Sequence, residues 1–72
     1  MNKNFYNKIG YKIKQRRNEL NMTQQQLADA VGVGLNHIGK IEIGYSKLSL
    51  DLLLKISTTL KQTVSELSDF NK

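Results

Sequence analysis

The sequence predicts a small all-α protein in which five short helices surround one hydrophobic core. Three observations support this fold class. The chain of 72 residues contains no proline, β-branched residues never alternate with polar ones over a sustained stretch, and residues that start and stop helices recur along the chain. Because this length holds one domain, we expect a single domain over residues 1–72, with its core at about 5–70.

The first predicted helix covers about Asn4 to Leu20 and ends at Asn21, a residue type that tolerates the left-handed conformation of a helix end. One side of this helix is apolar, and its members are Ile9, Ile13 and Leu20. The second helix begins after Thr23, which has Gln26 three residues later in the spacing of a capping box. Gly32 ends this helix, whose apolar stripe consists of Leu27, Ala28 and Val31.

The third predicted helix, Leu35 to Ile43, follows a very short connection and ends at Gly44. Because Gly32 adopts positive φ without strain, the chain can turn sharply between two helices there. Spacing of about 100° per residue puts Ile38, Ile41 and Glu42 on one side. The opposite side carries Asn36, Gly39, Lys40 and Ile43. We therefore expect one face to anchor the helix and the other to present polar groups to a partner.

Ser49 is expected to cap a fourth helix from Leu50 to Leu60, and a capping box of Thr63 and Glu66 starts a fifth that ends near Phe70. The apolar side chains of the fourth helix spread over roughly 200°, wider than the usual stripe of about 100°. Two explanations are open. Either this is a central helix surrounded by its neighbours, or some of its leucines form a subunit interface.

The positive charge is concentrated near the start of the chain. Eleven Lys and Arg residues against six Asp and Glu residues give a net charge of +5. Residues 1–20 contain six of the basic groups and one acid, Glu19. A concentrated positive surface attracts polyanions, because neutralised phosphates release their counterions. The alternative is a solvated helix face that only keeps the protein soluble.

Composition disfavours metal, cofactor and catalytic chemistry. The chain has no cysteine and a single histidine, His37, whereas metal sites and acid–base networks need several partners. We expect no metal, no cofactor and no enzymatic activity. No apolar run approaches the roughly 18 residues of a membrane span, and Met1 to Ile9 lacks the apolar stretch of a signal peptide. A cytoplasmic protein is therefore expected.

These segments resemble the phage repressor/Cro-like helix-turn-helix family, often called XRE. The resemblance runs from about Ile9 to Leu67 and is carried by IGYKIKQRR, MTQQQLADAVGV, HIGKIEIG and SLDLLLKIS. It implies a five-helix, lambda-repressor-like domain whose third helix lies in the major groove of double-stranded DNA. It further implies a transcriptional regulator, more often a repressor than an activator. A phage or mobile-element switch protein and a restriction–modification controller both fit.

The resemblance also implies individual roles. Gln24 would bind a phosphate, and the loop residues Tyr45, Ser46 and Lys47 would follow the sugar–phosphate backbone. The residues near base edges would be Gly34, Leu35, Asn36 and Lys40. Arg17 and Glu42 would form a partly buried ion pair. Arg16 stands where the family often has leucine, which suggests a cation facing solvent or phosphate.

Two positions have alternative interpretations. Leu35 contacts a thymine methyl group or is partly buried, and His37 hydrogen-bonds a phosphate or occupies an ordinary surface position.

Members of the family commonly pair through the end of the domain, which implies a homodimer on an inverted-repeat operator. The expected interface residues are Leu52, Val64, Leu67 and Phe70. Two rival functions remain. The fold could serve as a protein-interaction module, such as an antitoxin or antirepressor, or as a non-specific DNA binder.

Overall fold

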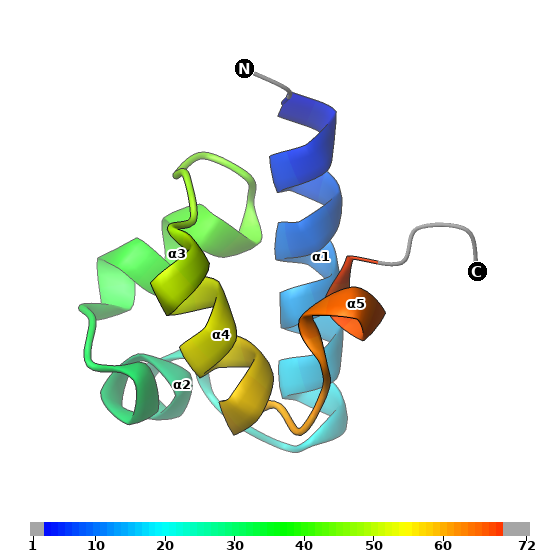
Figure 1. The fold of residues 1–72 in the computed structure, drawn as a ribbon. Coiled ribbons are helices and arrows are strands. Elements are labelled where there is room, and N and C mark those ends of the chain that lie inside the picture. The colour runs from blue at the N-terminus through cyan, green and yellow to red at the C-terminus, as the bar shows by residue number, and fades with distance from the viewer. Residues whose placement is uncertain (1–2, 69–72) are drawn as a thin grey trace.

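Five helices follow one another in the computed structural model, which describes residues 3–68. Their bounds are α1 Lys3–Glu19, α2 Gln24–Val31, α3 Leu35–Glu42, α4 Leu50–Thr59 and α5 Val64–Leu67. In Figure 1, α1 is the longest helix, α2 and α3 lie together on one side, α5 lies on the other, and α4 lies between them. The all-α class is confirmed. The end of α5 at Leu67 corrects the expected end near Phe70, which lies outside the described residues.

Capping side chains start three of the helices as the sequence predicts. Thr23 and Thr63 each form a complete capping box, and Ser49 accepts a hydrogen bond from the backbone N–H of Leu52 at 3.1 Å. The second capping box also lowers the pKa of the Glu66 carboxyl below its ordinary value, because the backbone N–H of Thr63 donates a hydrogen bond to this carboxylate.

Residues with a left-handed backbone conformation follow the ends of several helices. Asn21 and Gly32 have φ of 55° and 77°, and Lys61, which the sequence did not single out, has φ of 58° after α4. The ends of α1 and α4 repeat one pattern, in which a left-handed residue is followed two positions later by a threonine cap. The N–H groups of Met22 and Gln62 close the two ends by donating to Arg17 and Ser57 carbonyls. These closed ends keep each inter-helix connection short.

The core is one cluster to which every helix contributes. Its buried side chains are Ile9, Ile13, Leu27, Ala28, Val31, Ile38, Ile41, Leu52, Leu53, Ile56, Leu60 and Leu67. Helix α4 packs against α2 on one flank and α5 on the other, so it is a central helix. Its outer side leaves Leu50 and Leu54 at 68% and 49% exposure.

This core corrects the expected subunit interface. Leu67 is completely buried and Leu52 is 9% exposed, so both side chains belong to the core and offer almost no surface to a second molecule. Both pack inward because α4 and α5 cover each other. Val64 is partly buried against the core, and Phe70 lies outside the described residues.

A close contact between α1 and α3 depends on Gly10. A Cβ atom at this position would overlap the carbonyl oxygen of Ile41 and lie 2.8 Å from that of Glu42. Any side chain here would push α3 away from α1. At the end of α3, Gly44 has φ of 78° and packs directly on Asn7, so the loop that leaves α3 is also held against α1. Within residues 3–68, no helix combines the length and apolar character needed to cross a bilayer.

We expect Gly10→Ala to lower the free energy of unfolding by about 1–3 kcal/mol, because the backbone oxygens it meets have no alternative rotamer. Denaturant unfolding followed by circular dichroism measures this. Gly39→Ala is the matched control. No atom lies within 4 Å of its added Cβ, and alanine in a helix gains up to about 1 kcal/mol over glycine. Equal losses in the two variants would contradict the close α1–α3 packing.

Candidate nucleic-acid interface

The turn between α2 and α3 is held from inside. Ala28 is fully buried, and its carbonyl oxygen accepts hydrogen bonds from the N–H groups of Gly32 at 2.9 Å and Val33 at 3.0 Å. The Val33 side chain packs against the core. On α3 itself, Ile38 and Ile41 are 0% and 1% exposed. These contacts fix the rotation of α3 about its own axis.

The opposite side of α3, which we call the outer face, consists of Asn36, Gly39, Lys40 and Ile43. Asn36 and Lys40 are exposed, and Ile43 is 67% exposed. Around Gly39 the space is open, since within residues 3–68 no atom beyond its own stretch of helix lies within 4 Å of the position that a Cβ would take. The outer face therefore has an amide, an ammonium group and a stretch of bare backbone within one turn of helix.

The other residues that the resemblance assigned to bases lie at the start of α3. Gly34 is the N-cap of α3 and is exposed. Leu35 is 42% exposed, so much of this side chain remains accessible. His37, which was expected to bind a phosphate or to occupy an ordinary surface position, lies beside them and is half-buried. These residues and the outer face are adjacent, since all belong to the same eight-residue helix and its cap.

The loop that leaves α3 carries three of the expected phosphate contacts. Tyr45 is 78% exposed, Lys47 is exposed and Ser46 is half-buried. The N–H of Tyr45 donates to the carbonyl oxygen of Lys40 at 2.8 Å. This hydrogen bond ties the start of the loop to the end of α3, so loop and helix form one continuous surface.

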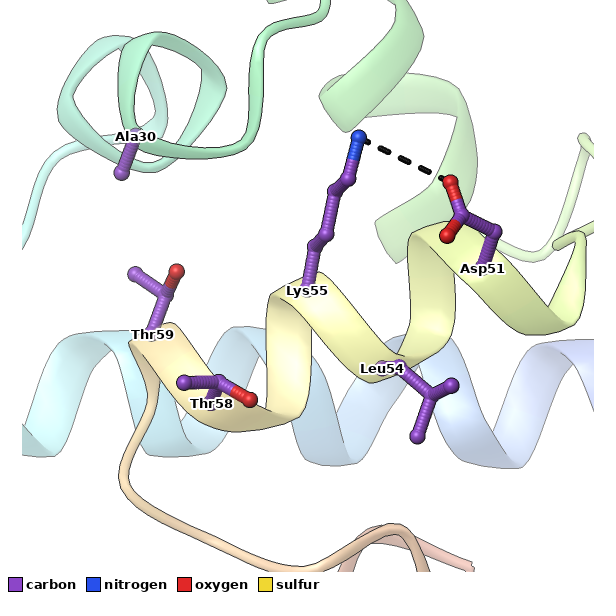
Figure 2. Close-up of a pocket in the computed structure, with 6 residues that line it drawn as sticks. All are labelled: Ala30, Asp51, Leu54, Lys55, Thr58 and Thr59. Carbon is purple, nitrogen blue, oxygen red and sulfur yellow. Dashed lines mark ion pairs between the residues drawn. The ribbon is translucent and has the colours of Figure 1, made fainter.

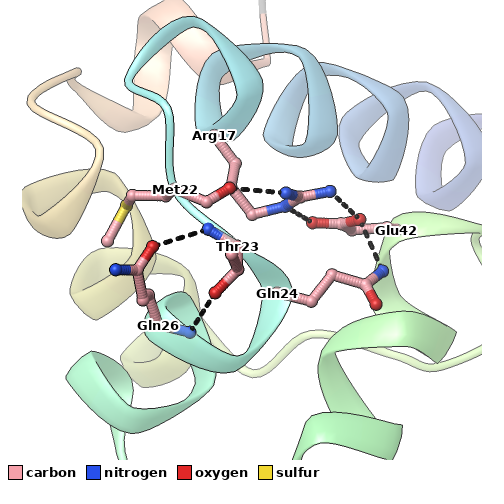
Figure 3. A network of polar contacts seen from close by, with 6 residues as sticks. All are labelled: Arg17, Met22, Thr23, Gln24, Gln26 and Glu42. Carbon is pink, nitrogen blue, oxygen red and sulfur yellow. Dashed lines mark hydrogen bonds and ion pairs between the residues drawn. The ribbon is translucent and has the colours of Figure 1, made fainter.

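A buried polar network connects α3 to the two helices before it (Figure 3). Arg17 Nε and Nη2 donate to the two carboxylate oxygens of Glu42 at 2.7 and 3.1 Å. Both residues are almost fully buried, at 6% and 5% exposure. Arg17 Nη1 also donates to the carbonyl oxygen of Met22 at 2.7 Å. Arg17 and Glu42 thus form the ion pair that the resemblance implied, and its geometry is bidentate.

Gln24 joins the same network. Its Nε2 donates to Glu42 Oε1 at 3.0 Å (Figure 3). A primary amide has two N–H donors, so one remains for a second acceptor. Because Gln24 is the first residue of α2, its side chain lies at the positive end of the helix dipole. The combination suits a phosphate oxygen.

Arg16 corrects an expectation. Its Nε donates to the carbonyl oxygen of Leu60 at 2.9 Å, and its Nη1 lies 3.2 Å from Glu19 Oε1. The side chain is therefore held against the end of α4 and is only 26% exposed, instead of facing solvent freely. No local pattern marks this contact, because its partner is 44 residues away.

The charge around α3 favours an anionic partner. From residue 30 to residue 50 the only acid is Glu42, and the bases are Lys40 and Lys47. The Glu42 carboxylate is buried against the Arg17 guanidinium, so its charge is compensated. The exposed charges of this stretch are therefore positive.

A second feature, a shallow hollow between α2 and α4, is a weaker candidate (Figure 2). It is lined by Ala30, Asp51, Leu54, Lys55, Thr58 and Thr59. Asp51 and Lys55 pair across one helix turn at 3.6 Å and are well exposed. Within residues 3–68, no three His, Cys, Asp or Glu side chains come together to hold a metal. The hollow presents no arrangement of groups for catalysis.

A family model described as helix-turn-helix matches residues 13–67. The chain belongs to the helix-turn-helix family. The membership that the sequence indicated is confirmed. Within this family the chain is 33% identical over 60 residues to the transcriptional repressor RstR of the cryptic phage CTXphi in Vibrio cholerae, a match covering 83% of this chain and 54% of RstR. The chain spans about half the length of the curated relatives it matches, or less.

Solved helix-turn-helix structures share the fold. The restriction-modification controller protein C.AhdI from Aeromonas hydrophila aligns with a TM-score of 0.82 and 29% identity, over 86% of this chain and 94% of C.AhdI. SinR, a master regulator for biofilm formation solved in complex with DNA, aligns with a TM-score of 0.79 and 34% identity, over 85% of this chain and 98% of the SinR chain. The lambda-repressor-like arrangement of five helices is confirmed.

We expect Glu42→Ala to lower the free energy of unfolding by about 3–5 kcal/mol, because it leaves the Arg17 guanidinium buried without its counter-charge. Urea denaturation measures the loss. The matched control is Glu19→Ala, which breaks the exposed pair with Arg16 and should cost at most about 1 kcal/mol. If both variants were as stable as the wild type, the buried pair would have no structural role.

Proposed function

We propose that this chain is a transcriptional regulator, more specifically a repressor, that binds double-stranded DNA in a sequence-specific way with α3 in the major groove. The observation that carries the proposal is the outer face of α3. It presents Asn36 and Lys40 to solvent on a helix that the core fixes from behind. The naming of RstR as a repressor and the solved complex of SinR with DNA support it.

In this function Asn36 makes paired hydrogen bonds to an adenine, and Lys40 donates to a guanine or to a phosphate. The exposed part of Leu35 contacts a thymine methyl group, and Gly34 lets the backbone approach the base edges. The groups that position the helix on the backbone are Gln24, His37, Tyr45, Ser46 and Lys47. Such contacts fix register without reading sequence.

We propose that the regulator acts in the cytoplasm and has no enzymatic activity of its own. A protein-interaction module would not need an outer face with positive charge and a free Gln24 donor. A non-specific DNA binder would carry the same charge as a sequence-specific one. The dependence of binding on DNA sequence distinguishes these two kinds of DNA binder.

We further propose a homodimer on an inverted-repeat operator, with recognition helices about 34 Å apart. The interface differs from the one expected from sequence. The exposed apolar side chains of α4 are Leu50 and Leu54, which lie one helix turn apart. Asp51 and Lys55 flank them, so two antiparallel copies of α4 would place opposite charges against each other.

We expect Asn36→Ala to relax the preference for one base pair, at a cost of about 1–3 kcal/mol there. Selection of bound sites from random DNA, followed by titration at stated salt, measures the change. Lys47→Ala is the control, which should weaken binding to all sequences alike and reduce the salt slope by about one unit. An unchanged consensus for Asn36→Ala would show that another face reads the sequence.

We expect Gly39→Ala to weaken DNA binding while it stabilises the fold. The added methyl group meets no protein atom within 4 Å, but it stands on the face that approaches the base edges. Thermal melting and titration with the selected site separate the two effects. Tighter or equal binding would mean that the bare backbone at Gly39 is not needed for close approach.

We expect Leu54→Glu to prevent pairing while the fold remains intact, because this side chain is half exposed. Mass measurement in solution, with and without a two-site duplex, reports the stoichiometry. Tyr11→Glu, at a 59% exposed position on α1, is the control. If Leu54→Glu still bound the duplex as two copies, the interface would lie elsewhere.

A further inference from the structure

Ile43 is an exposed isoleucine directly after α3. Its exposure is 67%, whereas Ile38 and Ile41 on the same helix are 0% and 1% exposed. At about 100° per residue, its side chain is about 20° from Asn36 and about 60° from Lys40 around the helix axis. Ile43 therefore belongs to the outer face, although it is apolar and the neighbouring exposed groups are polar.

The backbone holds Ile43 in place. Its N–H donates to the carbonyl oxygen of Gly39 at 3.3 Å, and the next residue, Gly44, packs directly on Asn7. On the helix surface Gly39 is one turn before Ile43 and offers no side chain to cover it. The isoleucine is thus presented on a rigid support with one flank open.

The position of Ile43 on the helix determines which apolar group of DNA it can reach. The major groove offers thymine methyl groups on the base edges, and the deoxyribose rings form its walls. Recognition helices contact bases with their N-terminal residues. Ile43 is seven residues beyond Asn36, about 10 Å along the helix axis. It also leads directly into the loop with Tyr45 and Lys47. At that distance from the base-contacting end of the helix, the apolar surface within reach of Ile43 is the deoxyribose rings at the edge of the groove.

We propose that Ile43 packs against the carbon atoms of a deoxyribose at the edge of the major groove. This inference rests on the proposed function of α3. The contact excludes water from the end of the interface. Its contribution to affinity depends on neither DNA sequence nor salt concentration, because it involves neither a base edge nor a charge. Ile43 thereby positions α3 by a third kind of interaction, beside hydrogen bonds and phosphate contacts.

The test compares wild-type protein with Ile43→Ala on the selected site and on each single-base variant of it, over a series of salt concentrations. Ile43→Ala removes three carbon atoms, and since a single sugar covers only about half of their surface, binding should weaken about tenfold on every duplex. The sequence preference and the slope of log affinity against log salt should not change. Replacing each thymine by deoxyuridine should cost the variant as much as the wild type.

Controls separate the outcomes. Tyr11→Ala removes a similarly exposed side chain from α1 and should leave binding unchanged, and thermal melting checks that Ile43→Ala is folded. Unchanged affinity of Ile43→Ala would overturn the contact. Loss of sensitivity to one deoxyuridine would overturn it in favour of a thymine methyl group, and a reduced salt slope would overturn it in favour of an electrostatic effect.

Failure of the proposed function looks different. Wild-type protein would then bind selected and random duplexes equally. The Ile43 contact would still be judged on the random duplex, where a tenfold loss supports it and no loss overturns it.

Discussion

The arrangement of α3 depends on one buried ion pair. The Arg17 guanidinium of α1 and the Glu42 carboxylate at the end of α3 lose their hydration together, so each would be costly to bury alone. The pair makes two further hydrogen bonds, since Arg17 donates to the Met22 carbonyl oxygen and Glu42 accepts from the Gln24 amide. Because these partners come from the α1–α2 connection and the start of α2, one network fixes three elements. Packing of Ile38 and Ile41 is non-directional, whereas the bidentate pair allows a single geometry.

This constraint leaves the outer face of α3 free of structural duties. Anchoring is done by the core and the buried pair, and within residues 3–68 the side chains of Asn36 and Lys40 have no hydrogen-bond or ion-pair partner that they must keep. Glu42 would otherwise repel phosphates, but its charge is compensated inside the protein. The same carboxylate orients the Gln24 side chain, which makes the expected phosphate contact part of the network that holds α3.

Local rules were sufficient for the helices, since caps such as Thr23 and Thr63 and the left-handed Asn21 act within a few residues of chain. The buried face of α3 followed from its period, and the Arg17–Glu42 pair from the family resemblance. Tertiary contacts were missed. Nothing near Gly10 indicates that a carbonyl of α3 will touch it, and Arg16 binds a carbonyl far along the chain. The leucines of α4 are spread so widely around the helix axis that the sequence alone does not distinguish buried from exposed ones. The sequence therefore places Leu52 in an interface, although it belongs to the core.

If α3 reads the operator, DNA contacts its outer face. Backbone amide chemical shifts of the ¹⁵N-labelled chain, recorded as the selected duplex is added, locate the residues that DNA touches. We expect the largest changes in α3, at the start of α2 and in the loop through Lys47, and little change in amides at the exposed side of α1. Large changes along α1 or α5 with α3 unaffected would contradict this expectation.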